Sequence, residues 1–186
     1  MVAKITDMVQ FEILAGLPPY GEPALNFDVG VGREGFVVRF FRQNGGSWIG
    51  NFSAGIGAVS EVIELADRRL LVFANGRGYL VDVEAPELAT TISSGIKSVL
   101  RDPVRDQIIL DDQGLWFTAI RLDGTRAWRS ARISWDGFRD LEITGGVLTG
   151  DAYAPWNPPF DWIRFSLDLI TGNHTGGNYA DPKQQR

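Results

Sequence analysis

The residues best suited to recognise a partner lie in the C-terminal half of the chain, around two tryptophans. Trp135 precedes an Asp136-Gly137 turn, and Trp156 stands in the segment Tyr153-Ala-Pro-Trp-Asn-Pro-Pro-Phe160. Proline stiffens a loop, so an aromatic ring held there loses little entropy on binding and can act as an anchor. Packing over a sheet edge is the alternative role for both rings. The partner-binding candidates are Trp135, Asp136, Asp151, Tyr153, Trp156 and Asp161.

Two of these acids could also perform chemistry on a sugar. Asp151 and Asp161 flank the Trp156 segment, and two carboxylates held at the correct separation hydrolyse a glycosidic bond. Aromatic rings nearby would suit sugar stacking. The more ordinary role of such acids is to cap turns and to pair with arginines, so the pattern leaves both interpretations open.

The residues that the chain lacks exclude several kinds of site. It has no Cys, which excludes disulfides, thiolate zinc sites, iron–sulfur clusters and cysteine nucleophiles. Its single His, His174, excludes metal sites that need two imidazoles. The sequence contains neither the Gly-x-Ser-x-Gly elbow of a serine hydrolase nor a phosphate-binding loop. We therefore expect no cofactor, no metal and no enzymatic activity.

The charge balance bears on the class of partner. The net charge of −5 argues against a nucleic-acid partner, because nucleic-acid binders carry a basic surface. Arginines supply 15 of the 18 basic residues, and residues 101–140 hold seven Arg and seven Asp. Such a stretch forms either surface ion pairs of small value or a patch that recognises a protein.

Membrane and export signals are not evident in the sequence. No apolar run approaches the roughly 18 residues that cross a bilayer. The start, MVAKITDMVQFEILAG, does not have the pattern of a signal peptide. We expect a cytoplasmic protein with no membrane partner.

Short strands must position these residues. Runs rich in Val, Ile, Phe and Trp alternate with turns such as Asn75-Gly76, Asp123-Gly124 and Gly145-Gly146, which is typical of an antiparallel all-β protein. Trp48, Trp116 and Trp162 lie inside such runs, so we expect them in the core. The expected strands are Gly35–Phe41, Ser47–Phe52, Val59–Leu65, Leu70–Phe73, Gly78–Val83, Gln107–Leu110, Leu115–Leu122, Trp128–Ser134, Phe138–Ile143, Val147–Ala152 and Trp162–Leu169; Thr6–Leu14 fits a helix or a strand.

An internal repeat organises these strands. Units open at Gly57, Gly95 and Gly137, at spacings of 38 and 42 residues, which lie in the range of propeller blades. Residues 24–56 could supply a shorter first unit. Each unit has the pattern strand, turn, strand, turn, strand, with an acid near the end of the last long strand: Asp82, Asp123 and Asp168.

These features predict an all-β chain of repeated antiparallel meanders. The expected architecture is a small or incomplete propeller-like body, and a two-layer β-sandwich is the alternative. We expect a single domain over residues 1–186, with residues 1–23 as an N-terminal lead-in and residues 177–186 as a polar tail.

The chain also resembles a family of small, largely uncharacterised bacterial all-β proteins. The resemblance spans nearly the whole chain, but its motifs are signatures of strands and turns, so it implies a fold and no catalytic residue. The motifs are Gly16-Leu-Pro-Pro-Tyr-Gly21, Arg33-Glu-Gly-Phe-Val-Val38, Ser47-Trp-Ile-Gly-Asn-Phe52, Gly76-Arg-Gly-Tyr-Leu-Val-Asp82, Arg132-Ile-Ser-Trp-Asp-Gly-Phe138, Asp168-Leu-Ile-Thr-Gly172 and Gly176-Gly177.

Small acidic members of such families are similar to immunity proteins, which neutralise a bacterial toxin. We therefore expect a non-enzymatic protein-binding module, and most specifically an immunity-type inhibitor whose partner is a cationic toxin. The alternatives are a carbohydrate-binding or carboxylate-based carbohydrate-acting protein, and an open blade assembly that completes itself by oligomerising.

Overall fold

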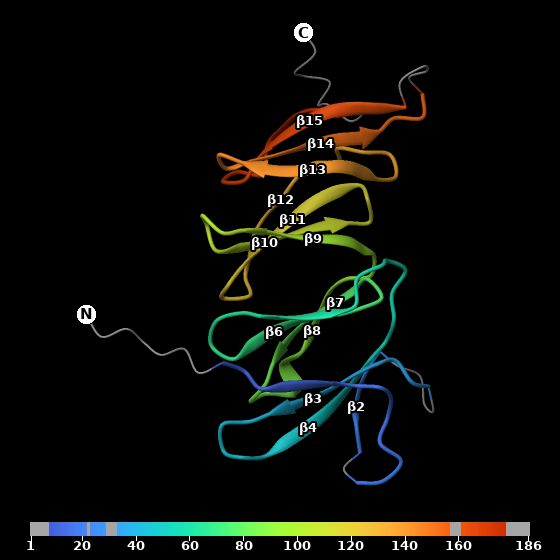
Figure 1. Ribbon diagram of the computed structural model, residues 1–186, viewed down its shortest axis with the longest axis vertical. Coiled ribbons are helices and arrows are strands. Elements are labelled where there is room, and N and C mark those ends of the chain that lie inside the picture. The colour runs from blue at the N-terminus through green and yellow to red at the C-terminus, as the bar shows by residue number, and fades with distance from the viewer. Residues whose placement is uncertain (1–7, 22, 29–32, 157–160, 178–186) are drawn as a thin grey trace, which may run out of the picture. The chain divides into compact units, whose positions relative to one another are not determined.

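A computed structural model describes residues 8–21, 23–28, 33–156 and 161–177 (Figure 1). Within them the chain forms sixteen strands in four four-stranded sheets, here called sheets A to D. It divides into two compact units, unit 1 (Met1–Gly95) and unit 2 (Ile96–Arg186). Each unit is described by itself, and the single domain over residues 1–186 stays a prediction.

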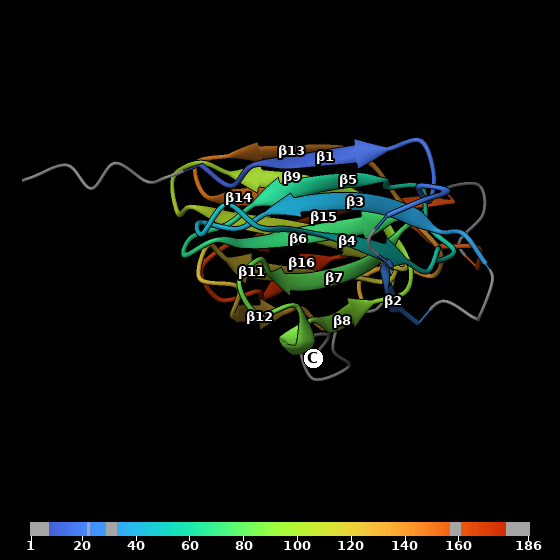
Figure 2. The same ribbon diagram turned by 90° about the horizontal axis from the view of Figure 1, so that it is seen from below.

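Unit 1 contains sheets A and B. Sheet A has the order β1-β3-β4-β2, in which β2 pairs with β4 in parallel, and sheet B is an antiparallel meander in chain order. A short 3-10 helix, η1 (Pro86–Leu88), precedes the last strand of sheet B (Figure 2). The strands are β1 (Phe11–Leu14), β2 (Leu25–Phe27), β3 (Phe36–Phe41), β4 (Ser47–Phe52), β5 (Glu61–Glu64), β6 (Arg69–Ala74), β7 (Arg77–Asp82) and β8 (Thr90–Ser93).

The core of unit 1 lies between the facing sides of sheets A and B. Phe40, Trp48 and Phe52 of sheet A pack in one buried cluster with residues such as Val72 and Tyr79 of sheet B. The Trp48 ring stacks on Phe40 at 4.3 Å between centroids, and its Nε1–H donates to the carbonyl of Val83 at 2.9 Å. The indole is therefore buried with its one polar group satisfied, which confirms the expected core role of Trp48.

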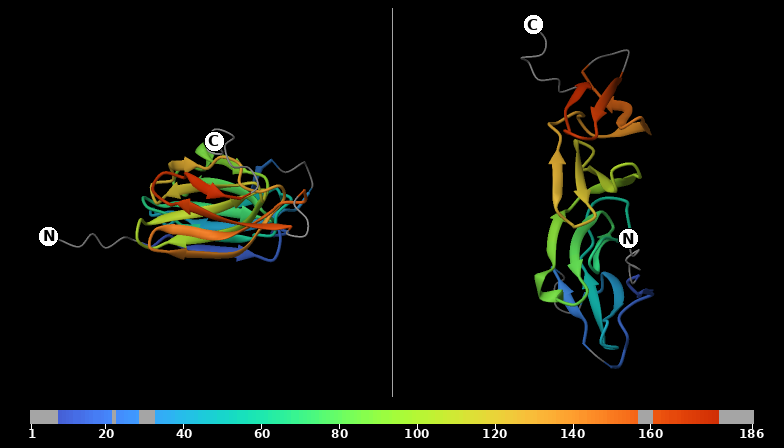
Figure 3. Two further views of the ribbon diagram at one scale, coloured as in Figure 1. Left: turned by 90° about the horizontal axis from the view of Figure 1, so that it is seen from above. Right: turned by 90° about the vertical axis from the view of Figure 1, so that its left-hand side faces the viewer.

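Unit 2 contains sheets C and D, which are both antiparallel meanders in chain order. Figure 3 shows the strands of sheet D, in orange and red, lying side by side. The strands are β9 (Ile96–Asp102), β10 (Gln107–Asp112), β11 (Trp116–Arg121), β12 (Arg126–Arg129), β13 (Phe138–Thr144), β14 (Val147–Tyr153), β15 (Trp162–Asp168) and β16 (His174–Gly176).

The core of unit 2 joins one face of sheet C to one face of sheet D. Phe117 of β11 packs with Leu148 of β14 and Phe165 of β15 in one buried cluster. Because side chains alternate along a strand, Asp151 and Tyr153 of β14 lie on the other side of sheet D, here called its outer face. The alternating burial of β14 agrees with this assignment.

The prediction of an all-β, propeller-like body is confirmed. Within the described residues there are four sheets rather than the two of a sandwich, and three of them are four-stranded antiparallel meanders, the unit of a propeller blade. Gly57, Gly95 and Gly137 each precede the first strand of a sheet, so the repeat was placed correctly. Each repeat has one short strand more than the three expected.

Two local expectations are refined by the structure. Of the two options open for Thr6–Leu14, the structure shows a strand, β1, at Phe11–Leu14 in sheet A. The expected strand Trp128–Ser134 stops at Arg129. The reason is the side chain of Ser130. Its Oγ accepts the Phe117 N–H at 3.0 Å, in the place that a backbone carbonyl would take if the strand continued.

Candidate binding surface

An exposed pair of tryptophans marks the strongest candidate surface of unit 2. The rings of Trp135 and Trp156 lie at 5.6 Å between centroids and at 84°, an edge-to-face contact. Trp156 is 73% exposed and Trp135 is 38% exposed. We call these two residues the aromatic platform. They lie 21 positions apart in the chain, and the structure brings them together as partner-binding candidates.

Arg132 holds Trp135 in place. Its Nε donates to the carbonyl of Ser134 and its Nη2 to the carbonyl of Trp135, both at 3.0 Å. Its guanidinium also lies 5.0 Å from the centre of the Trp135 ring, within reach of a cation–π contact. One arginine thus fixes both the backbone and the ring of Trp135.

Ser134 fastens the same segment to sheet D. It is buried, its Oγ–H donates to the carbonyl of Gly137 at 2.6 Å, and its Oγ accepts the N–H of Tyr153 at 3.0 Å. The N–H of Trp135 in turn donates to the carbonyl of Tyr153 at 3.0 Å. Two of these bonds therefore tie the β12–β13 connection to Tyr153 at the end of β14, and the third is internal to the connection.

A second group of candidates lies on the outer face of sheet D. Asp151 of β14 has Arg139 of β13 and Arg164 of β15 as its direct neighbours across the sheet, with N–O distances of 3.4 and 3.5 Å. The Arg139 guanidinium also lies 4.5 Å from the centre of the Trp162 ring, and that ring is 5.3 Å from the ring of Tyr153. Asp151 and Tyr153 thus belong to one connected row of side chains.

The two remaining candidates have separate surroundings. Asp136 forms an ion pair with Lys97 at 3.0 Å. Asp161 is exposed, and its carbonyl accepts the N–H of Ala154, which closes the base of the Trp156 segment. Residues 157–160 of that segment lie outside the described residues.

The structure changes the expected role of two tryptophans. Trp116 and Trp162 are half-buried and belong to neither core cluster. Each carries a guanidinium over its ring, because Arg129 lies 4.0 Å from the centre of Trp116 and Arg139 lies 4.5 Å from that of Trp162. The rings of Trp116 and Trp162, which we expected in the core, are therefore covered by arginine side chains instead.

One acid of unit 2 has a strongly shifted pKa. Asp111 of β10 is buried, and this burial raises the pKa of its carboxyl to about 6. A hydrogen bond from Gly114 N–H, at 2.9 Å, opposes the shift without cancelling it. Asp111 lies near the end of β10, and in the turn that follows, Gln113 and Gly114 both have positive φ.

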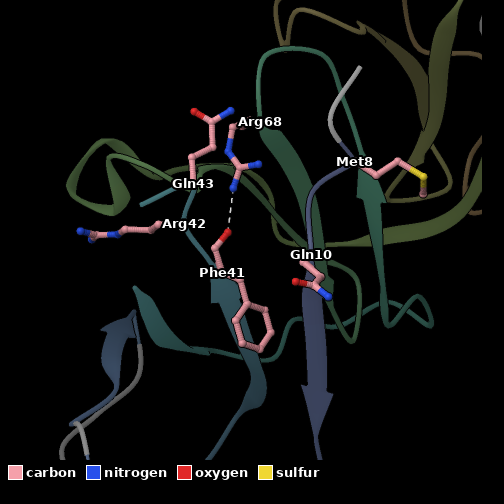
Figure 4. A pocket seen from close by; sticks show the side chains of 6 residues that line it. All are labelled: Met8, Gln10, Phe41, Arg42, Gln43 and Arg68. Carbon is pink, nitrogen blue, oxygen red and sulfur yellow. Dashed lines mark hydrogen bonds between the residues drawn. The ribbon is translucent and has the colours of Figure 1, made fainter. Parts of the chain in front are cut away.

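Unit 1 has a polar hollow of about 300 Å³ at the ends of β3 and β6 (Figure 4). Arg68 crosses it: Nη2 donates to the carbonyl of Phe41 at 2.7 Å, and Nε donates to Glu84 at 2.8 Å. Burial raises the pKa of Glu84, but bonds from Gln43 N–H and Arg68 outweigh this effect and hold the pKa below its ordinary value. Arg68 therefore links the end of β3 to Glu84 within unit 1.

The described ranges contain no group of three acids or histidines that could hold a metal ion. They also contain no helix with the length and hydropathy needed to cross a bilayer.

Comparison with protein-family models and with curated protein sequences finds no match. Among solved structures the chain is similar to BamB from Moraxella catarrhalis, with 12% sequence identity and a TM-score of 0.45. That similarity covers 78% of this chain and 46% of the BamB chain, so this chain spans less than half the length of that structure.

Proposed function

We propose that the chain is a non-enzymatic protein-binding module whose contact surface is the aromatic platform. The observation that carries this proposal is Trp156, which is 73% exposed although Trp135 supports one side of it. Exposed aromatic rings of this kind dominate protein interfaces when their geometry is fixed before binding. Arg132 and Ser134 supply that fixed geometry for Trp135.

The more specific proposal is an immunity-type inhibitor that neutralises a basic bacterial toxin in the cytoplasm. The net charge of −5 supports it, and unit 1 carries eleven acidic against seven basic residues. A negative field accelerates the encounter with a positively charged protein, and it disfavours nucleic acid and anionic membranes. The resemblance to small acidic immunity proteins points in the same direction.

The test is affinity capture from the native lysate with wild-type protein, the Trp156→Ala variant and a matched control. Ile170→Ala is that control, because Ile170 is 67% exposed in the β15–β16 turn of the same unit. We expect wild type and Ile170→Ala to capture one protein that Trp156→Ala loses. That protein should stop growth when it is produced alone and permit growth when it is produced with this chain. Equal capture by all three, or a captured protein without toxicity, contradicts the proposal.

A carbohydrate-binding protein is the second candidate, because Trp156 and Asp161 are both exposed and the backbone of Asp161 is bonded to Ala154, two residues before Trp156. The carboxylate-based hydrolase is less well supported, since Asp151 lies between two guanidinium groups in the structure. A glycan array with wild type and Trp156→Ala distinguishes the candidates. Sugar binding that depends on Trp156 would replace the immunity proposal.

A further inference from the structure

A second hollow of unit 1 combines an apolar floor with an acidic rim. It measures about 270 Å³, and its lining residues are Asp67, Arg69, Leu80, Asp82 and Leu88. We call it the Leu88 hollow. Leu88 belongs to the short helix η1 and is 66% exposed, so its apolar side chain is accessible to a partner.

The two carboxylates of the rim are held in place by their turns. Oδ1 of Asp82 accepts the N–H of Glu84 at 2.9 Å and that of Ala85 at 3.2 Å, while Oδ2 has no hydrogen bond among the described residues. Asp67 and Arg68 both have positive φ in the β5–β6 hairpin turn, and the Asp67 side chain is 69% exposed. Each acid thus presents oxygen to solvent from a defined backbone position.

Arg69 only partly balances this charge. Its Nη2 lies 3.8 Å from Oδ2 of Asp67, near the limit of an ion pair, and exposed pairs of that length contribute little. Asp82 faces Arg69 across the β6–β7 pair but forms no ion pair with it within the described ranges. Glu87 of η1 is exposed nearby and adds a further negative charge. The hollow therefore keeps a net negative charge.

We propose that the Leu88 hollow docks one lysine or arginine side chain of a protein partner. The aliphatic stem of that side chain would lie on Leu80 and Leu88, and its charged end would reach Asp82 and Asp67. Long cationic side chains combine an apolar stem with a charged head, which matches a floor and rim of this composition. The inference rests on the proposed function, because it takes the partner to be a basic protein.

The test uses short peptides as probes of the full-length chain. The methyl signals of Leu80 and Leu88 are followed by NMR during titration with acetyl-Gly-Lys-Gly-amide, its arginine counterpart and its norleucine counterpart. Norleucine keeps the apolar stem and lacks the charge. We expect saturable shifts with lysine and arginine and much weaker shifts with norleucine. Asp82→Asn should reduce the lysine affinity about threefold, as for one exposed ion pair, while keeping the acceptor of the turn.

Glu61→Gln is the matched control, because it removes an acid of the same unit outside the hollow. It should leave the peptide affinity unchanged. Equal shifts with lysine and norleucine, or equal losses in Asp82→Asn and Glu61→Gln, would overturn the inference. If the peptides fail while Trp156-dependent capture of a toxin persists, only this inference falls. If the lysine peptide binds while no toxin is captured, the cation site stands and the proposed function falls.

Discussion

At the scale of single residues, Asp111 should set a pH dependence of stability. Its pKa is about 6 in the folded chain, against 3.8 for an ordinary Asp, so the folded state holds its proton more tightly. The free energy of unfolding therefore falls as pH rises from 4 to 6. Asp111→Asn removes this loss and can still accept the Gly114 N–H. Relative to wild type, the variant should gain about 2 kcal/mol between pH 4 and pH 7.

Urea unfolding of wild type and variant at several pH values measures this difference. Asp106→Asn is the control, because Asp106 is exposed and its positive φ is one that Asn accepts readily. Its stability should follow that of wild type at every pH. A constant difference between Asp111→Asn and wild type from pH 4 to pH 7 would show that Asp111 keeps an ordinary pKa.

The sequence could identify the candidate residues but not the partners that hold them. Trp156 is a candidate from the sequence because its place in a proline-rich segment and its residue type are both visible there. Arg132 was missed although it lies three positions before Trp135, because its role depends on a chain that turns back on itself. Arg139 and Arg164 meet Asp151 only through the register of sheet D. Nothing in a linear pattern reveals that register.

At the scale of elements, an aspartate recurs at or just after the end of the third strand of three sheets. Oδ1 of Asp82 accepts two backbone N–H groups, and Oδ1 of Asp168 accepts those of Ile170 and Thr171. Asp123 accepts the N–H and the hydroxyl of Thr125. The acid that the sequence repeat places at this point is therefore a turn residue, which satisfies backbone donors where the strand stops.

Asn51 should decide whether the parallel edge strand β2 stays in sheet A. It is buried, its Oδ1 accepts the Gly35 N–H at 2.8 Å, and its Nδ2 donates to Asn26 of β2 at 2.8 Å. Asn51→Ala leaves these groups without partners, at a cost of about 2–4 kcal/mol. Chemical denaturation measures this cost, and hydrogen exchange should show faster exchange at Phe27.

The exposed Asn44 in the β3–β4 turn provides the comparison for Asn51. Its side chain accepts only the Gly46 N–H, so Asn44→Ala should cost less than about 1 kcal/mol and leave β2 unchanged. Similar costs for the two alanine variants would mean that the Asn51 network does not hold β2.

Strands with strong turn signals could be predicted, whereas the short edge strands could not. The β6–β7 hairpin follows from Asn75-Gly76, where both residues have positive φ as the turn requires. In contrast, β2 and β16 have three residues each, too few to establish an alternating pattern. Their positions depend on tertiary bonds, such as those of Asn51 to β2.

At the scale of the whole molecule, each unit has its own buried core. The cluster around Phe40 and Leu70 draws its members from unit 1, and the cluster around Phe117 and Leu148 draws its members from unit 2. Within each unit, one sheet packs on the other, so each core gains its stability from contacts inside its own unit. We therefore predict that the two units open separately; unfolding of residues 1–186 as one domain is the alternative outcome.

Hydrogen exchange in two cavity variants tests this independence. Leu70→Ala and Leu148→Ala each remove a buried side chain at a cost of about 2–5 kcal/mol. Leu70→Ala should lower amide protection in sheets A and B, while sheets C and D keep wild-type protection. Leu148→Ala should show the reverse pattern, because opening events follow cooperative units. An equal loss of protection across all four sheets in both variants would instead show that residues 1–186 unfold as one domain.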